Sequence, residues 1–367
     1  MVECEQIIKK GGIGMEQALI AMSGGVDSSV AAYLALQQNL SCCGATMKLW
    51  DPQILGNAPV STDDARAVAQ RLGMPFYEVD AAGEFCRQVV EPFIHAYEEG
   101  LTPNPCILCN RHLKFSYLLD KALQLGCRYV VTGHYARIVF DKTSGRYLLY
   151  KAADGAKDQT YFLASLTQRQ LSHTLFPLGE LTKEQVRAIA AEQGFGNAQK
   201  RDSQDICFVP DGDYKGFMEQ YGKKTYPQGD FLDETGKVVG RHNGAVGYTL
   251  GQRKGLGLAM GSPVYVCGKD MQRNTVTVGP EAQLFTSVLW AKDCNFIPFD
   301  TLTEPMRVTA KARSRHTEQP ATVYPEGDGR IRVEFDEPQR AITAGQAVVL
   351  YQGDMVVGSG TILSIDN

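Results

Sequence analysis

Apolar and polar residues follow two different periods along the first half of the chain. Continuously apolar runs predict buried strands at residues 17–22, 42–49, 75–79 and 128–132. Stretches rich in Ala and Leu, or with a helical apolar period, predict helices at residues 28–38, 61–72 and 110–125. Ser61 or Thr62 is the expected N-cap of the second helix. Strands that alternate with helices indicate an α/β fold with a doubly wound parallel sheet, whose ligands bind at the carboxyl ends of the strands.

The pattern changes near residue 210. Gly, Val, Thr and Tyr become frequent, and short alternating runs such as residues 275–278 and 330–335 predict strands with one buried face. We therefore expect the α/β domain to be followed by two smaller β-rich domains, the last of them barrel-like. The predicted boundaries are an N-terminal extension at 1–16, the α/β domain at 17–209, a central domain at 210–284 and a C-terminal domain at 285–367.

Composition narrows the class of protein. Of 367 residues, 44% are hydrophobic and 21% charged, which is typical of a globular protein, and the apolar runs are too short to span a bilayer. The N-terminus does not resemble a signal peptide, so the ten cysteines favour a reducing compartment and a cytoplasmic protein. The formal net charge of −4 excludes a globally basic nucleic-acid binder, although a local basic face stays compatible with it.

Basic residues are nevertheless concentrated in two stretches without acids, residues 235–269 and 307–316. The members are Lys237, Arg241, Arg253, Lys254, Lys269, Arg307, Lys311, Arg313, Arg315 and His316. Such runs are often only solvated loops, but they are also the pattern of a surface that contacts RNA phosphates.

A glycine loop joins the first predicted strand to the first predicted helix. Its sequence is SGGVDSS, residues 23–29. Two glycines let the backbone approach a ligand, and the hydroxyls and free N–H groups at a helix start bind anions. The loop lacks the GxxxxGK[ST] pattern and is therefore not a Walker A motif. A plain serine-capped turn is the alternative interpretation.

Two cysteines three positions apart, Cys106 and Cys109, precede the helix predicted at 110–125. A helix N-terminus lowers the pKa of a thiol, which favours a reactive Cys109. A zinc site would need four ligands, and Cys207 is the best third partner. The remaining cysteines considered are expected to be small buried hydrophobic residues, namely Cys42, Cys43, Cys86, Cys127, Cys267 and Cys294.

Seven blocks in order resemble one family. They are SGGVDSS at 23–29, LTPNPCILCN at 101–110, LKF at 113–115, TGHYA at 132–136, KDQTYFL at 157–163, SQDICFV at 203–209 and GYTLGQRKGLG at 247–257. The loop is similar to that of the ATP-pyrophosphatase (PP-loop) superfamily, whose members adenylate an oxygen and release pyrophosphate. The blocks together resemble the bacterial tRNA-specific 2-thiouridylases, from about residue 17 to near the C-terminus.

The resemblance implies ATP and Mg²⁺ as cofactors, and a tRNA of the Lys, Glu or Gln type whose uridine 34 is thiolated at carbon 2. It implies sulfur supplied by a donor protein or by sulfide. ATP would be bound by Ala21, Met22, Ser23, Gly24, Gly25, Val26, Asp27, Ser28, Met47 and Gly133, with Asp27 also on the metal. The flipped base would contact Asn104, Pro105 and Cys106, and tRNA would contact His134, Lys157, Asp158, Gln159, Arg313, Ser314 and Gln346.

The resemblance assigns catalysis to Cys109 as nucleophile and Cys207 as carrier of persulfide sulfur, ending in a disulfide between them. Many members carry Asp where this chain has Cys106. Three thiols together would also suit a [4Fe–4S] cluster with one iron open to sulfide, so both routes stay open. Ser314 stands where the family usually has an aromatic residue.

Two other functions fit part of this pattern. A GMP or NAD synthetase would use the same loop with ammonia and would not need the thiols. A non-catalytic module that binds nucleotide or zinc would need neither tRNA nor pyrophosphate release.

Overall fold

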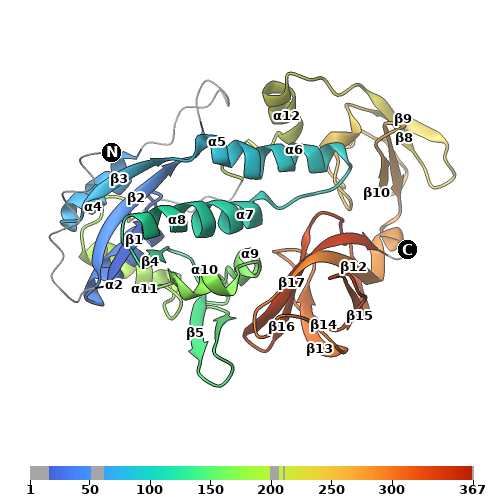
Figure 1. The fold of residues 1–367 in the computed structure, drawn as a ribbon. Helices are drawn as coiled ribbons and strands as arrows, with labels where there is room; N and C mark the ends of the chain where they lie inside the picture. Colours follow the sequence, from blue (N-terminus) through green and yellow to red (C-terminus); the bar gives the residue numbers. More distant parts are fainter. Residues whose placement is uncertain (1–15, 51–61, 199–205, 210, 366–367) are drawn as a thin grey trace. The chain divides into compact units, whose positions relative to one another are not determined.

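The computed structural model describes residues 16–50, 62–198, 206–209 and 211–365. They form two compact units (Figure 1). The first contains the residues up to Gln88 together with Cys106–Gln204 and Asp354–Val356. The second contains Val89–Pro105, Asp205–Gly353 and the residues from Val357 onward. Within the described residues no helix is both long and apolar enough to cross a membrane.

The first unit is built on a parallel five-stranded sheet in the order β3-β2-β1-β4-β7. Its strands are β1 (Gln17–Ala21), β2 (Ser41–Lys48), β3 (Phe76–Asp80), β4 (Tyr129–Val131) and β7 (Thr174–Leu175). The prediction of a doubly wound α/β fold is confirmed. The sheet also contains β7, which the apolar pattern did not predict.

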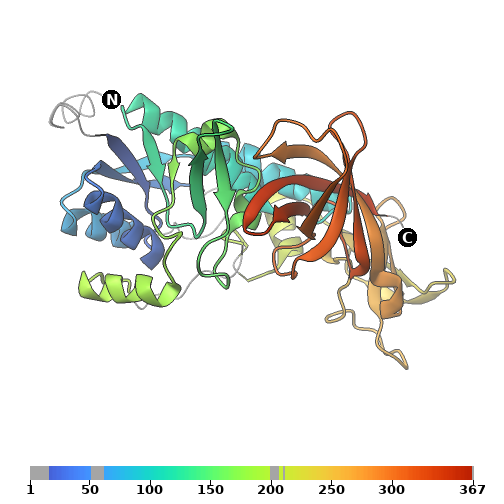
Figure 2. The ribbon, with the colours of Figure 1, turned by 90° about the horizontal axis from the view of Figure 1, so that it is seen from below.

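Side chains that alternate along β1 enter two different cores. Ala18 and Ile20 pack with helices α2 (Val26–Gln37), α4 (Asp63–Arg71) and α11 (Lys183–Glu192). Leu19 packs on the opposite face with α8 (Leu118–Gln124). Figure 2 shows α2, α4 and α11 on one side of the sheet and α8 on the other. Because both faces are covered, β1 reads as a continuous apolar run.

The helix expected at residues 110–125 begins earlier than predicted. It starts with α7 (Pro105–Leu108), continues as a π-helical segment η3 (Cys109–Tyr117) and ends as α8. Proline is favoured at the first helical position, since its missing N–H has no partner there in any case. Cys109 therefore lies one turn inside the helix, and the expectation that it occupies a helix N-terminus is wrong.

Shorter elements complete the first unit. They are α5 (Ala82–Phe85), η2 (Cys86–Val90, whose last two residues belong to the second unit), β5 (Arg137–Asp141), β6 (Arg146–Tyr150), α9 (Thr160–Leu163) and α10 (Gln168–Ser172). Thr62 is the N-cap residue of α4, but its hydroxyl donates to Glu78 Oε1 at 2.8 Å instead of capping the helix. Ser61, the other expected cap, lies outside the described residues.

The second unit contains two helices and two β structures. The helices are α6 (Glu91–Glu98) and α12 (Tyr214–Gly222), joined by contacts of Phe93 and Tyr97 with Tyr214. A four-stranded sheet has the order β10-β11-β8-β9 and a core around Phe231. Its strands are β8 (Gly229–Leu232), β9 (Val238–His242), β10 (Tyr265–Asp270) and β11 (Thr275–Gly279), with 3-10 turns η4 (Ala245–Gly247) and η5 (Glu281–Leu284) beside them.

The remaining strands form a closed antiparallel barrel of six strands. They are β12 (Phe285–Phe296), β13 (Met306–Lys311), β14 (Gln319–Pro325), β15 (Ile331–Arg340), β16 (Ala347–Gln352) and β17 (Met355–Ile365). The barrel closes because β12 pairs with both β15 and β17. Closure removes the free edges of the sheet, and it confirms the prediction of a barrel-like last domain.

Candidate active site

The glycine loop lies between the end of β1 and the start of α2. Gly24 has φ +73°, a conformation that a residue with a Cβ rarely adopts. The Ser28 hydroxyl donates to the carbonyl of Gly25 at 3.0 Å and accepts from the Ser23 amide at 3.3 Å. These bonds hold the loop against the first turn of α2, whose leading N–H groups have no intrahelical partner. The loop thus has the geometry of an anion site.

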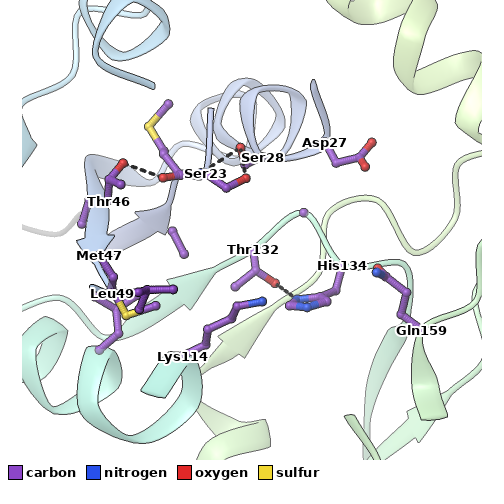
Figure 3. A pocket seen from close by; sticks show the side chains of 15 residues that line it. Ser23, Asp27, Ser28, Thr46, Met47, Leu49, Lys114, Thr132, His134 and Gln159 are labelled. Carbon is purple, nitrogen blue, oxygen red and sulfur yellow. Dashed lines mark hydrogen bonds between the residues drawn. The ribbon is translucent and has the colours of Figure 1, made fainter. Parts of the chain in front are cut away.

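A pocket of about 250 Å³ opens beside this loop (Figure 3). Ser23 and Ser28 line one side, and Lys114 and His134 come from the opposite side. The other lining residues are Ala21, Met22, Asp27, Ala45, Thr46, Met47, Leu49, Leu118, Thr132, Gly133 and Gln159. Seven of the ten residues predicted to bind ATP line it, and Gly24, Gly25 and Val26 complete the loop beside them. Their role toward ATP stays a prediction.

Asp27 carries the one carboxylate among the described residues that line the pocket. Its two oxygens accept from Lys183 Nζ at 2.7 and 2.8 Å, and Oδ1 also accepts from the Tyr135 hydroxyl at 2.9 Å. The Lys183 side chain is only 9% exposed, so Asp27 supplies its counter-charge in a poorly solvated place. Proteins usually bind Mg²⁺ through one or two carboxylates together with the phosphates of a nucleotide. A single carboxylate beside the glycine loop fits this arrangement.

Gly133 sits at the carboxyl end of β4 because no larger residue fits there. A Cβ at this position would lie 2.6 Å from the carbonyl carbon of Asp27 and 2.7 Å from the Ser28 amide nitrogen. The close approach brings β4 against the start of α2. The sequence predicted Gly133 at the site, and the steric reason is visible only in the structure.

His134 and Gln159 were expected to meet tRNA, and the structure places both in the wall of the pocket. His134 is 9% exposed, and its Nδ1 lies 2.7 Å from the Thr132 hydroxyl. Burial, with the charge of Lys114, holds the pKa of His134 well below its usual value, so the ring is neutral. Gln159 Oε1 accepts from the Tyr135 amide at 2.9 Å.

Four residues near the loop were missed by the sequence analysis. Thr46 donates to the Met22 carbonyl at 2.6 Å, and Asn197 Nδ2 donates to the Gly24 carbonyl at 3.0 Å and to Ser29 Oγ at 2.9 Å. Lys114 and Lys183 supply the positive charge described above. Only the helix-start pattern TKEQ at 182–185 signalled that Lys183 stands at a helix N-terminus.

The two neighbouring thiols lie on the helix that begins at Pro105. Cys106 is exposed and Cys109 half-buried, and their i, i+3 spacing puts them on the same helix face. Desolvation raises the pKa of the Cys109 thiol above its ordinary value, and the positive charge of Lys114 opposes this rise. The same two effects act on Cys106, although part of its surface is open to solvent. The expected lowering of the Cys109 pKa is therefore wrong.

Cys207 is exposed and belongs to the second unit, whereas Cys106 and Cys109 belong to the first. Of SQDICFV, residues 203–205 lie outside the described part. Within the described ranges no group of three or more His, Cys, Asp or Glu side chains could hold a metal ion. The pairing of Cys109 with Cys207 stays a prediction.

The other cysteines lie mostly in apolar surroundings. Cys42, Cys86 and Cys127 are buried, whereas Cys43, Cys267 and Cys294 are half-buried. Cys43 Sγ lies 3.8 Å from Cys127 Sγ in the core beneath α8.

Other residues expected to meet tRNA also have partners inside the protein. Arg313 donates to the Leu250 carbonyl at 3.2 Å and to the Thr343 hydroxyl. Asp158 accepts from the Ala152 amide at 3.0 Å and from the Thr160 hydroxyl at 2.5 Å. Lys157 and Ser314 are half-buried. Gln346 also bonds internally, as described below.

Several cations of the two basic stretches are paired with acids from elsewhere in the same unit. Arg307 donates to Asp336 at 2.6 Å, Arg241 lies 3.8 Å from Asp230, and Lys311 lies 3.9 Å from Glu318. Four exposed cations of these stretches have no ion pair within the described part of the chain, and these are Lys237, Arg253, Lys254 and Arg315.

Comparison with known proteins gives consistent relatives over most of the chain. The family model described as "tRNA methyl transferase HUP domain" matches residues 16–211, that described as "tRNA methyl transferase PRC-barrel domain" matches 215–280, and "Aminomethyltransferase beta-barrel domain" matches 286–362.

Three curated relatives of similar length carry the name tRNA-specific 2-thiouridylase MnmA. The one from Clostridioides difficile is 49% identical over 95% of this chain and 98% of its own length. That from Acetivibrio thermocellus is 48% identical over 95% and 99%, and that from Moorella thermoacetica 50% identical over 95% and 99%. The chain therefore belongs to the family of tRNA-specific 2-thiouridylases.

Proposed function

We propose that this protein thiolates carbon 2 of the wobble uridine 34 in tRNAs for Lys, Glu and Gln, with ATP as activator and a cysteine as sulfur carrier. The observation that carries the proposal is the phosphate loop at residues 23–29 beside a pocket lined by Lys114, a residue of the helix that bears Cys106 and Cys109. Nearly full-length identity to curated relatives of that name supports it.

The loop and pocket would carry the first half of the reaction. The free N–H groups at the start of α2 bind the phosphates of ATP, and Lys114 adds positive charge from the opposite wall. Asp27 would hold Mg²⁺, which when bound neutralises phosphate charge. Uridine O2 attacks the α-phosphorus of ATP, the bond from this phosphorus to the bridging oxygen breaks, and pyrophosphate leaves while the base becomes adenylated.

The thiols would carry the second half. Asn104, Pro105 and Cys106 contact the flipped base, so that carbon 2 is open to attack. The terminal sulfur of a Cys207 persulfide attacks carbon 2, and AMP leaves with the electron pair of the broken C–O bond. The Cys109 thiolate then attacks Cys207 Sγ, which releases 2-thiouridine and leaves a Cys109–Cys207 disulfide. An external thiol reductant restores both cysteines, and the persulfide of a donor protein then transfers its terminal sulfur to the Cys207 thiolate. With free sulfide the reloading is different: hydrosulfide attacks Cys207 Sγ of the disulfide, which frees the Cys109 thiolate and forms the Cys207 persulfide.

The decisive experiment incubates the protein with tRNA, ATP, Mg²⁺ and a sulfur source. Digested nucleosides are then searched for 2-thiouridine, and pyrophosphate release is measured in parallel. We expect both products, with pyrophosphate release dependent on tRNA. Cys109→Ser and Cys207→Ser should abolish 2-thiouridine, while Cys43→Ser, a half-buried thiol of the sheet core, should not.

Each alternative predicts a different result. A GMP or NAD synthetase would keep its activity in both cysteine variants and would ignore tRNA. A non-catalytic module would bind ATP and release no pyrophosphate. If the protein purified without oxygen binds iron, and Cys106→Ser loses both iron and thiolation, the cluster route replaces the persulfide route.

A further inference from the structure

Residues 101–105, here called the 101–105 segment, end at Pro105, the residue directly before Cys106. This segment belongs to the second unit, as does the barrel. The turn between β15 and β16 of the barrel, residues 341–346, lies directly against it. The Thr102 amide donates to the Ala344 carbonyl at 2.9 Å. The barrel is thus hydrogen-bonded to the stretch of chain that leads into the helix carrying Cys106 and Cys109.

Gln346 makes the side-chain part of this contact. Its Nε2 donates to the Thr102 carbonyl at 2.7 Å and approaches the Pro103 carbonyl at 3.5 Å. Its own backbone is fixed, because its carbonyl accepts from the Ile362 amide at 2.8 Å and its amide donates to the Thr343 carbonyl at 3.3 Å. A side chain anchored in this way can hold its partner in one place.

Gly345 shows how closely the two backbones approach. It has φ +87°, and a Cβ there would lie 2.9 Å from Leu101 Cβ and 3.0 Å from the Thr102 amide nitrogen. Thr343, two residues earlier, donates to the Ala341 carbonyl at 2.9 Å and accepts from Arg313. The turn is therefore fixed both by the bonds of Thr343 within the barrel and by its contacts with the 101–105 segment.

We propose that Gln346 is a positioning residue: its amide holds the 101–105 segment on the barrel, and so fixes the chain from which Cys106 and Cys109 follow. Its donor group is used inside the protein. This differs from the tRNA contact that the family resemblance implies for Gln346. The proposal rests on the proposed function only where it concerns turnover.

The test is hydrogen exchange measured by mass spectrometry on the free full-length protein, without ATP or tRNA. Gln346→Met removes the donor and keeps the length of the side chain. Gln352→Met is the matched control, since Gln352 is an exposed glutamine at the end of the same strand, β16. The peptide with Thr102 should exchange about two- to ten-fold faster in Gln346→Met, as expected for loss of one hydrogen bond, and normally in Gln352→Met.

Turnover gives the second readout. In Gln346→Met the kcat for tRNA thiolation should fall, while tRNA affinity and the KM for tRNA stay at wild-type values. Unchanged exchange at Thr102 with weakened tRNA binding would overturn the proposal in favour of a direct tRNA contact. If peptides of β13 and β14 also exchange faster, Gln346→Glu, which keeps the shape but cannot donate when ionised, repeats the test.

The two hypotheses fail in different ways. A wild-type protein that makes no 2-thiouridine refutes the proposed function, yet the exchange measurement stands without it. Normal thiolation in the wild type, with no change in exchange in either Gln346 variant, refutes the positioning role alone.

Discussion

Asp27 is held by side chains that lie 108 and 156 positions further along the chain. The sequence motif placed Asp27 at the phosphate loop, but it contained no sign of Tyr135 or Lys183. Removal of the carboxylate should affect the fold as well as the reaction, because Lys183 would be left as a poorly solvated cation without its counter-charge.

We predict that Asp27→Asn lowers tRNA-dependent pyrophosphate release by about 100-fold or more, the scale for loss of one charged transition-state contact. It should also lower the free energy of unfolding by about 1–3 kcal/mol, less than for a fully buried pair because Asp27 is partly exposed. The double variant Asp27→Asn/Lys183→Met should regain stability but not activity. Wild-type pyrophosphate release in Asp27→Asn would remove Asp27 from the reaction.

A second residue-scale prediction concerns Gly133. Gly133→Ala should weaken ATP binding and cost about 1–3 kcal/mol of stability, since the new methyl would meet the backbone of Asp27 and Ser28. Gly155→Ala is the control, because a Cβ at Gly155 meets nothing within 4 Å in the same unit. Calorimetric titration with ATP and thermal unfolding measure both effects. Equal ATP affinity in the two variants would contradict the steric argument.

At the scale of whole elements, the sequence predicted those helices and strands whose bounds depend on local sequence pattern. The strand–loop–helix at residues 17–38 combines a buried apolar run, two glycines and an alanine-rich helix, so β1 and α2 appear within two residues of their expected bounds. The helix that carries Cys106 and Cys109 was predicted to start at residue 110 but starts at Pro105, because this proline was not taken as a first helical residue. The helix α6 was missed altogether.

The contacts that complete the site were not predictable from pattern. Lys183, Asn197 and Thr46 reach the loop only after the chain has folded, and in the sequence they are an ordinary helix, loop and strand residue. The same holds for Gln346, whose partner lies 244 positions away. The sequence pattern also could not show that acids outside each basic stretch pair with several of its cations.

Strand β10 carries an unusual lysine that gives a prediction at this scale. Lys269 Nζ is buried without a hydrogen-bond partner among the described residues, and burial lowers its pKa from 10.5 to about 8. A folded-state pKa below the unfolded one means that charged Lys269 destabilises the fold below about pH 8. This cost disappears as the pH rises toward the unfolded pKa.

Lys269→Met should therefore stabilise the protein by about 1–3 kcal/mol at pH 7 and by little at pH 10.5. Lys237→Met is the control, since it makes the same substitution at an exposed position on the turn between β8 and β9. Denaturant unfolding at the two pH values measures the difference. A Lys269→Met gain that is equal at both would show that packing and not charge is responsible.

At the scale of the whole molecule, the cations must both pair with acids inside the protein and bind the phosphates of tRNA. The chain has a net charge of −4, yet its proposed substrate is a polyanion. Binding then depends on the few cations whose charge is not already used within the protein. In the second unit Arg307 is paired with Asp336 and Arg313 bonds to Leu250 and Thr343, so neither is free to meet phosphate without losing a contact.

Exposed Arg253, Lys254 and Arg315 are the better candidates for phosphate contact. Arg313→Ala should first disturb the barrel turn at Thr343, and its effect on tRNA binding would follow from the damage to the turn. Lys254 and Arg315 each stand in one of the two basic stretches, which lets the stretches be tested separately.

We predict that Lys254→Ala and Arg315→Ala each weaken tRNA binding and reduce the slope of log affinity against log salt by about one unit, the effect of losing one phosphate contact. ATP affinity should not change, because neither residue lines the nucleotide pocket. Arg307→Ala is the matched control: it removes the same charge from the same unit, but one that Asp336 already neutralises, so the salt slope should stay at its wild-type value. Filter binding of tRNA from low to high salt measures all three variants. If Arg307→Ala lowers the slope as much as the other two, ion pairing does not decide which cations meet the phosphates, and the net charge of the unit governs binding instead.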